Sequence, residues 1–225
     1  MNKLTATLLL LPLLTTGLRA RPPLPSLPPP TPPLPHRQPA VAQWSILYRY
    51  SADKKKPPTA RRPAPERIIK ITISKNQTTF HEQIHWQSGQ TAEQWIYQGR
   101  SLGTTPGSAE ISANPLSTEA DLIDYRRTDF PELTWLSLTH YRGVADFEGK
   151  PAYLFTQDLG NGRQRHAWLA PDTQYPLFTT DGEIERHYHY HPTPVPPPTP
   201  PAHYLKLFTQ WEKHTNQLAT PAARP

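Results

Sequence analysis

Apolar and polar side chains alternate along most of the chain between residues 41 and 98. Successive side chains of a β-strand point to opposite faces, so this period of two predicts half-buried strands. Short turn signals such as Lys75-Asn76-Gln77 separate the runs, which predicts an antiparallel meander. The apolar members of these runs are Trp44, Ile46, Tyr48, Tyr50, Ile69, Ile71, Ile73, Phe80, Ile84, Trp86, Trp95 and Tyr97.

The same alternation returns in the second half of the chain. Turn sequences divide it into runs, and Asp181-Gly182 between two of them is a strong hairpin signal. The two halves together predict a mainly β domain of the α+β class, built on an antiparallel sheet. The expected strands of the second half are 139–147, 151–158, 163–169, 174–180 and 183–191.

Three stretches depart from this pattern. Residues 99–117 contain Gly, Ser and Pro and are expected to form a loop. Thr118 is the expected N-cap of a short helix that is bounded by Pro131, because Glu119 and Asp121 suit the first turn. After the second proline-rich stretch, helical spacing predicts a C-terminal amphipathic helix. Its apolar residues are Tyr204, Leu205, Phe208, Trp211 and Leu218.

Proline is distributed unevenly and divides the chain into parts. Of 30 prolines, ten lie in Arg21–Pro39 and seven in Pro192–Pro201. Such stretches favour the extended polyproline II conformation, because each ring fixes φ and removes a donor. A semi-rigid spacer is expected, and a ligand for a proline-reading domain is the alternative for the first stretch. The expected parts are a signal peptide (1–20), a linker (21–40), the β domain (41–191), a second linker (192–201) and the helix with its tail (202–225).

The first 20 residues have the pattern of a secretory signal peptide, with Lys3 before the apolar run Leu8–Leu14. This run is too short to cross a hydrocarbon core of about 30 Å, so no transmembrane segment is expected in the mature chain. The protein is therefore expected to be exported, either periplasmic or secreted. Cysteine is absent, so packing alone has to hold the domain. The net charge of +6 comes without a recognisable nucleic-acid motif, and nucleic acid is not an expected partner.

The string His81-Glu82-Gln83-Ile84-His85 matches the H-E-x-x-H pattern of zinc peptidases. On a helix, His81 and His85 reach one zinc ion and Glu82 polarises the bound water. The flanking alternation instead predicts a strand, where the two histidines lie about 13 Å apart and Glu82 faces the other way. A zinc metallopeptidase is therefore kept as an alternative, while the main interpretation expects no catalytic residue and no cofactor.

A second histidine cluster is His187, His189 and His191, which share one face if the segment is a strand. Neighbours of this kind bind one metal when another element supplies a third ligand. An exposed strand that ends at Pro192 is the other interpretation. The chain has no Gly-x-Ser-x-Gly elbow, no phosphate-binding glycine loop and no cysteine nucleophile, which favours a non-enzymatic role.

Large apolar side chains recur at the inward positions of the predicted strands. They form either an ordinary sheet core or the wall of a curved sheet that keeps a cavity for an acyl chain or similar ligand. The candidate ligand-binding residues are Trp44, Tyr48, Ile71, Phe80, Trp86, Trp95, Tyr97, Tyr153, Phe155 and Trp168.

Three passages resemble the LolA and LppX-like half-barrel superfamily of exported bacterial proteins: residues 94–99 (QWIYQG), 147–153 (FEGKPAY) and 167–177 (AWLAPDTQYPL). The resemblance covers residues 41–191. It implies a strongly bent antiparallel sheet, or half-barrel, with one or two helices packed on it. The proline-rich stretches are foreign to that family, and Ala170 with Asp172 shifts its acidic turn position.

The resemblance also implies the carriage of lipids or lipidated proteins. With the export signal and the aromatic face, it leads us to expect an exported, non-enzymatic protein that binds a lipid, a lipoprotein or another apolar ligand in the bacterial envelope. An envelope scaffold without a small ligand is the remaining alternative.

Overall fold

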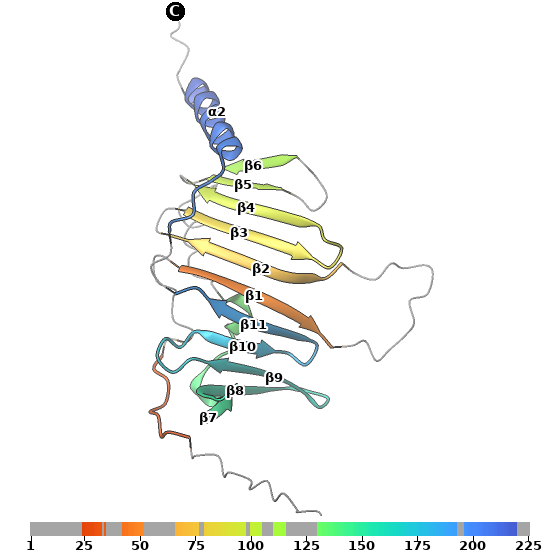
Figure 1. Ribbon diagram of the computed structural model, residues 1–225, viewed down its shortest axis with the longest axis vertical. Helices are drawn as coiled ribbons and strands as arrows, with labels where there is room; N and C mark the ends of the chain where they lie inside the picture. Colours follow the sequence, from red (N-terminus) through yellow and green to blue (C-terminus); the bar gives the residue numbers. More distant parts are fainter. Residues whose placement is uncertain are drawn as a thin grey trace, which may run out of the picture.

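The chain folds around one antiparallel sheet of eleven strands (Figure 1). The strand order is β6-β5-β4-β3-β2-β1-β11-β10-β9-β8-β7. The predicted mainly β class and antiparallel pairing are therefore confirmed. The structure is a computed structural model, which describes residues 24–32, 34, 42–51, 66–76, 79–97, 100–104, 110–115, 130–192 and 196–219.

Two meanders build the sheet, and they meet where β1 pairs with β11. At this junction Trp44 lies opposite Tyr190, and Tyr50 lies opposite Ile184. The first meander contains β1 (Ala42–Tyr50), β2 (Ile68–Lys75), β3 (Thr79–Trp86), β4 (Thr91–Tyr97), β5 (Arg100–Thr104) and β6 (Ile111–Pro115). The second contains β7 (Tyr141–Phe147), β8 (Lys150–Gly160), β9 (Arg163–Leu169), β10 (Pro176–Thr180) and β11 (Ile184–Tyr190).

The sheet is open, with β6 and β7 as its two edge strands, and it is not strongly curled (Figure 1). In this respect it differs from the strong bend that the half-barrel resemblance implies. The packing gives a physical reason. Each face of the sheet carries its own hydrophobic cluster, so the strands do not have to wrap around a single core.

The hairpin predicted at Asp181-Gly182 is confirmed between β10 and β11. Gly182 has a φ of 87°, which favours glycine. The Asp181 carboxylate accepts hydrogen bonds from the backbone N–H groups of Glu183 (3.0 Å) and Ile184 (2.9 Å). These backbone donors hold the pKa of Asp181 below its usual range despite the desolvation that opposes them.

The expectation of a loop over residues 99–117 is wrong for much of its length, because β5 and β6 form a hairpin there. Arg100 pairs with Pro115, and Thr104 pairs with Ile111. A Cβ at Gly103 would lie 3.2 Å from the carbonyl oxygen of Glu93, so glycine permits the close approach of β5 to β4. These strands are short and contain glycine and proline, so they show no regular alternation of apolar and polar residues.

The predicted C-terminal helix is confirmed as α2 (Ala202–Ala219), and it begins with a hydrogen bond from Leu205 N to Pro201 O. Two short 3-10 turns, η1 (Pro131–Leu133) and η2 (Leu138–His140), precede β7. No helix within the described ranges is long and apolar enough to cross a membrane. The expected helix at Thr118 and the signal segment 1–20 lie outside the described residues.

Candidate functional site

One face of the sheet, called the apolar face below, carries the larger hydrophobic core. On β1 the fully buried Trp44 lies between its pairing partners Ile73 and Tyr190. The pairing registers place buried residues of β11, β9 and β8 on this same face. The buried strand residues of this core are Ala42, Trp44, Ile46, Ile73, Tyr153, Phe155, Ala167, Leu169 and Tyr188.

Segments outside the strands cover the apolar face. Phe130, Leu133 and Leu136, within and beside η1, are buried against it. The ring centroid of Phe130 lies 6.0 Å from that of Trp44 and 5.9 Å from that of Tyr188. Residues 130–136 therefore cover the aromatic side chains of this face.

Ionisable side chains of the cover and of the sheet meet at one point of the apolar face. The hydroxyl of Tyr188 donates a hydrogen bond to the Glu132 carboxylate. Burial raises the pKa of Glu132 above its usual range. Burial, with the negative charge of Glu132 as a further cause, raises the pKa of Tyr48 to about 12. The Arg186 guanidinium lies 5.7 Å from the centroid of the Tyr48 ring and is the nearby positive charge.

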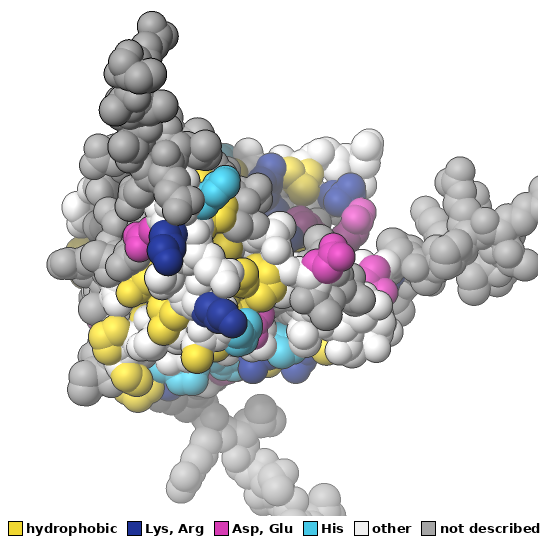
Figure 2. Space-filling model, turned by 90° about the horizontal axis from the view of Figure 1, so that it is seen from above, with side chains coloured by type: hydrophobic (Ala, Val, Ile, Leu, Met, Phe, Trp, Pro, Cys, Tyr) yellow, Lys and Arg dark blue, Asp and Glu magenta, His cyan; other side chains and the backbone are white. Residues whose placement is uncertain are grey.

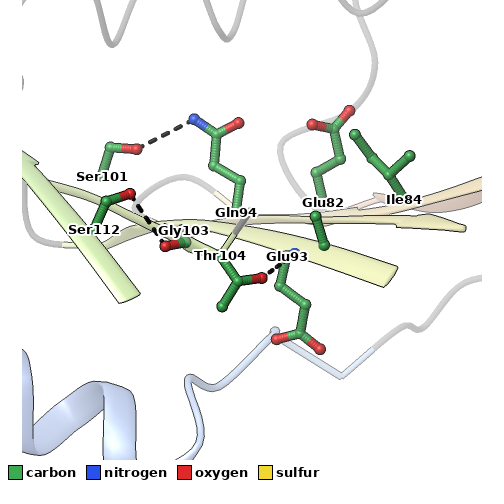
Figure 3. A pocket seen from close by; sticks show the side chains of 9 residues that line it. Glu82, Ile84, Glu93, Gln94, Ser101, Gly103, Thr104 and Ser112 are labelled. Atoms are coloured by element: carbon green, nitrogen blue, oxygen red, sulfur yellow. Dashed lines mark hydrogen bonds between the residues drawn. The ribbon is translucent and has the colours of Figure 1, made fainter. Parts of the chain in front are cut away.

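A hollow of about 200 Å³ lies beyond the covered region, over β3 to β6. Glu82 pairs with Ile73, which pairs with Trp44, so the hollow continues the apolar face. Figure 3 shows Glu82 and Gln94 on one side of the sheet, and Glu93 on the side of α2. The hollow is lined by Glu82, Ile84, Ala92, Glu93, Gln94, Ser101, Gly103, Thr104 and Ser112.

This hollow is more polar than the wall that it continues. Gln94 Nε2 donates to Ser101 Oγ at 3.1 Å, and Ser112 Oγ donates to the Gly103 carbonyl at 3.2 Å. Burial raises the pKa of Glu82. The apolar contribution comes from Ile84 and Ala92, so the hollow suits a small group with both polar and apolar parts.

The opposite face, called the helix face below, carries a second core at the β4–β6 end. Tyr204 and Phe208 of α2 are buried there against Trp95 and Leu102. The ring of His81 stacks on Trp95, with centroids 3.9 Å apart. Burial lowers the pKa of His81, although the charge of Glu93 opposes this.

At the other end of the helix face, rings of β7, β9 and β10 pack together. Trp168 lies 6.1 Å from Phe147 and 5.3 Å from Phe178, measured between ring centroids. A second hollow of about 260 Å³ opens beside them, lined by Phe147, Glu148, Lys150, Leu177, His187, Tyr188 and His189. Figure 2 shows histidine side chains among hydrophobic ones along one border of the molecule.

The structure does not bring all the candidate ligand-binding residues together. Trp44, Tyr48, Ile71, Phe80, Tyr153 and Phe155 belong to the core of the apolar face. Trp95, Tyr97 and Trp168 lie on the helix face, because alternation gives the apolar face to Ile96 and Ala167 instead. Trp86 is half-buried at the end of β3. The role of these residues in ligand binding stays a prediction.

The string His81-Glu82-Gln83-Ile84-His85 lies entirely within β3, which confirms the predicted strand. His81 and His85 point to the helix face, and Glu82 points to the apolar face. The one-turn spacing on which a helical zinc-peptidase motif depends is therefore not present in this segment.

His187 and His189 lie on β11, and His191 directly follows the strand. His187 packs edge-on against Phe178 with ring centroids 4.7 Å apart, while His189 is exposed. In the part of the chain that the structure describes, no group of three His, Cys, Asp or Glu side chains is placed to hold a metal ion.

Sequence analysis missed the residues that cover the apolar face. Phe130 and Leu133 are spaced by three, a helical signal that is too short to stand out beside the strand pattern. Leu27 also packs against this core, but it lies among prolines in the stretch that is expected to be a linker. Glu132 gave no signal at all, because its burial depends on contacts made far along the chain.

Comparison with known proteins does not place this chain in a family. No protein-family model matches it, and no curated protein matches its sequence. The coarse description therefore stands alone: an eleven-stranded antiparallel sheet with one helix in its described part.

Proposed function

We propose that this is an exported, non-enzymatic protein that binds a lipid, a lipoprotein or another apolar ligand in the bacterial envelope. The observation that carries the proposal is the cover of the apolar face. Aromatic side chains from both meanders are covered by a 3-10 turn and by part of the proline-rich segment before β1. A short 3-10 turn holds few backbone hydrogen bonds of its own, so this cover leaves the wall more easily than a strand leaves a sheet.

The dimensions of the open space refine this proposal. A hollow of about 200 Å³ is smaller than the roughly 300–1,000 Å³ of ordinary small-molecule sites. An acyl chain therefore needs the space that Phe130, Leu133 and Leu136 occupy. We expect binding to displace these side chains from the sheet. The free energy of this displacement lowers the affinity for the ligand.

A relationship with the LolA and LppX-like half-barrels remains part of the proposal. It is supported by the antiparallel strand order and by the three resembling passages, two of which supply members of the core of the apolar face, such as Tyr153 and Ala167. The weak curl of the sheet and the helix on the opposite face are departures from that fold.

A titration of the full chain with a dansyl-labelled fatty acid tests the proposal. We expect saturable fluorescence enhancement, and a several-fold lower Kd for Leu133→Ala, because truncation weakens the cover. Leu138→Ala is the matched control, because Leu138 is 49% exposed in the neighbouring turn. Absence of saturable binding to both the wild type and a folded Leu133→Ala variant would falsify the proposal.

A further inference from the structure

The proline-rich segment before β1 lies against the sheet. Leu27 and Leu34 pack on the core of the apolar face, and Pro30 is buried. Figure 1 shows the segment in red and orange beside the end of the sheet formed by β8, β9 and β10. A solvated spacer makes no such contacts, so this stretch is a bound peptide as well as a connection.

One hydrogen bond defines how the segment is held. The hydroxyl of Tyr153 donates to the carbonyl oxygen of Pro28 at 2.9 Å. Tyr153 is 4% exposed, and its ring packs edge-on against Tyr141 with centroids 5.8 Å apart. The donor is therefore fixed in position by the core and aimed at the segment.

This chemistry suits proline-rich chains in particular. Proline has no backbone N–H, so a proline-rich segment offers carbonyl acceptors, and an aromatic hydroxyl is a fitting donor. Its conformation is preformed, which lowers the entropy lost on binding, and aromatic grooves recognise such chains for this reason. Leu27 and Leu34 provide two separate apolar contacts between the segment and the core of the apolar face.

We propose that this surface is a recognition site for extended proline-rich peptides that carry two leucines at this spacing. Residues 24–32 and Leu34 occupy it within the same chain, and a peptide of the same chemistry from another protein takes it when they are released. This second specificity does not depend on the apolar ligand proposed above.

The resident segment competes with a free peptide for this site, and its connection to β1 is short. A short tether gives its segment an effective concentration of the order of millimolar at its own site. A free peptide therefore binds the wild-type chain only weakly, and weakening the resident segment uncovers the site.

A full-length Leu27→Ser/Leu34→Ser variant and a fluorescein-labelled peptide with the sequence of residues 24–34 test the proposal. We expect the variant to bind the peptide at least tenfold more tightly than the wild type does. Adding Tyr153→Phe should weaken this binding several-fold. Tyr50→Phe is the matched control, because it loses a hydroxyl that donates to Ile68 O at 3.0 Å in the other meander.

Three results overturn the proposal: no saturable binding to the folded double variant, equal binding of a peptide with serine at both leucine positions, or equal effects of Tyr153→Phe and Tyr50→Phe. If the double variant fails to fold, a second measurement tests the proposal on a chain that keeps both leucines. The chain has no cysteine, so Ser26→Cys accepts a single fluorophore. Excess peptide should lower the anisotropy of this label while the serine peptide should not, and equal responses to both peptides also contradict the proposal.

Discussion

At the scale of single residues, the face of the strand to which a side chain points decides how much it supports the fold. Trp44 on β1 is 0% exposed, while Leu47 on the same strand points to the helix face and is 37% exposed. Alternation in the sequence predicts this difference, because Trp44 belongs to a regular run. It does not predict Glu132, whose partial burial against Tyr188 results from tertiary packing.

Truncation of Trp44 should therefore be among the most damaging changes. We expect Trp44→Ala to lower the free energy of unfolding by about 3–5 kcal/mol, through lost burial and the cavity left behind. Leu47→Ala on the same strand should cost less than about 1 kcal/mol, as surface substitutions do. Urea denaturation followed by far-UV circular dichroism measures both free energies of unfolding. Similar destabilisation by the two substitutions would contradict the assignment of faces.

Glu132 should make stability depend on pH. Its folded pKa is raised by burial, so the folded state binds this proton more tightly than the unfolded state. The contribution to stability is thus fully present below the unfolded pKa, and it is lost as pH rises through the folded pKa.

Glu132→Gln keeps an acceptor for Tyr188 without a charge. We expect a smaller loss of unfolding free energy between pH 4.5 and pH 7.5 in this variant than in the wild type. An unchanged pH profile would count against the raised pKa.

At the scale of elements, α2 and the β5–β6 hairpin depend on each other. Leu102 of β5 is buried under Tyr204 and Phe208, and the Arg100 guanidinium lies 4.6 Å from the centroid of the Trp211 ring. The helix was predictable from its spacing of apolar residues. The hairpin was not, because its partner in packing lies about a hundred residues later in the chain.

Loss of this packing should release the hairpin selectively. We expect Phe208→Ser to speed amide hydrogen exchange in β5 and β6 by at least tenfold, with little change in β8 and β9. Gln210→Ser, at an exposed position of the same helix, is the control. Uniform acceleration across all strands would instead indicate a single cooperative unit.

At the scale of the whole molecule, two cores lie on opposite faces and towards opposite ends of one sheet. Most hairpins of the two meanders were predictable from local turn signals, and the β5–β6 hairpin was not. The pairing of β1 with β11 and the weak curl were not, because neither leaves a local mark in the sequence. The same holds for the cover of the apolar face, which decides how much open space a ligand finds.

Separate cores should behave independently. We expect the destabilisations of Phe155→Leu and Phe208→Leu to add within about 0.5 kcal/mol, as for distant sites. Trp44→Phe and Phe130→Leu, whose rings are 6.0 Å apart, should instead show a clear coupling energy. A double-mutant cycle by chemical denaturation measures both, and strong coupling in the first pair would indicate that the cores act as one.

The place of β1 in the sheet has a consequence for how the chain is made. Among the described strands, β1 is synthesised first, and one of its two neighbours, β11, is synthesised last. Until then one edge of β1 offers unpaired backbone groups, which are templates for wrong association. Pairings between such distant segments also form slowly. Association through this edge therefore competes with correct folding until β11 has paired with β1.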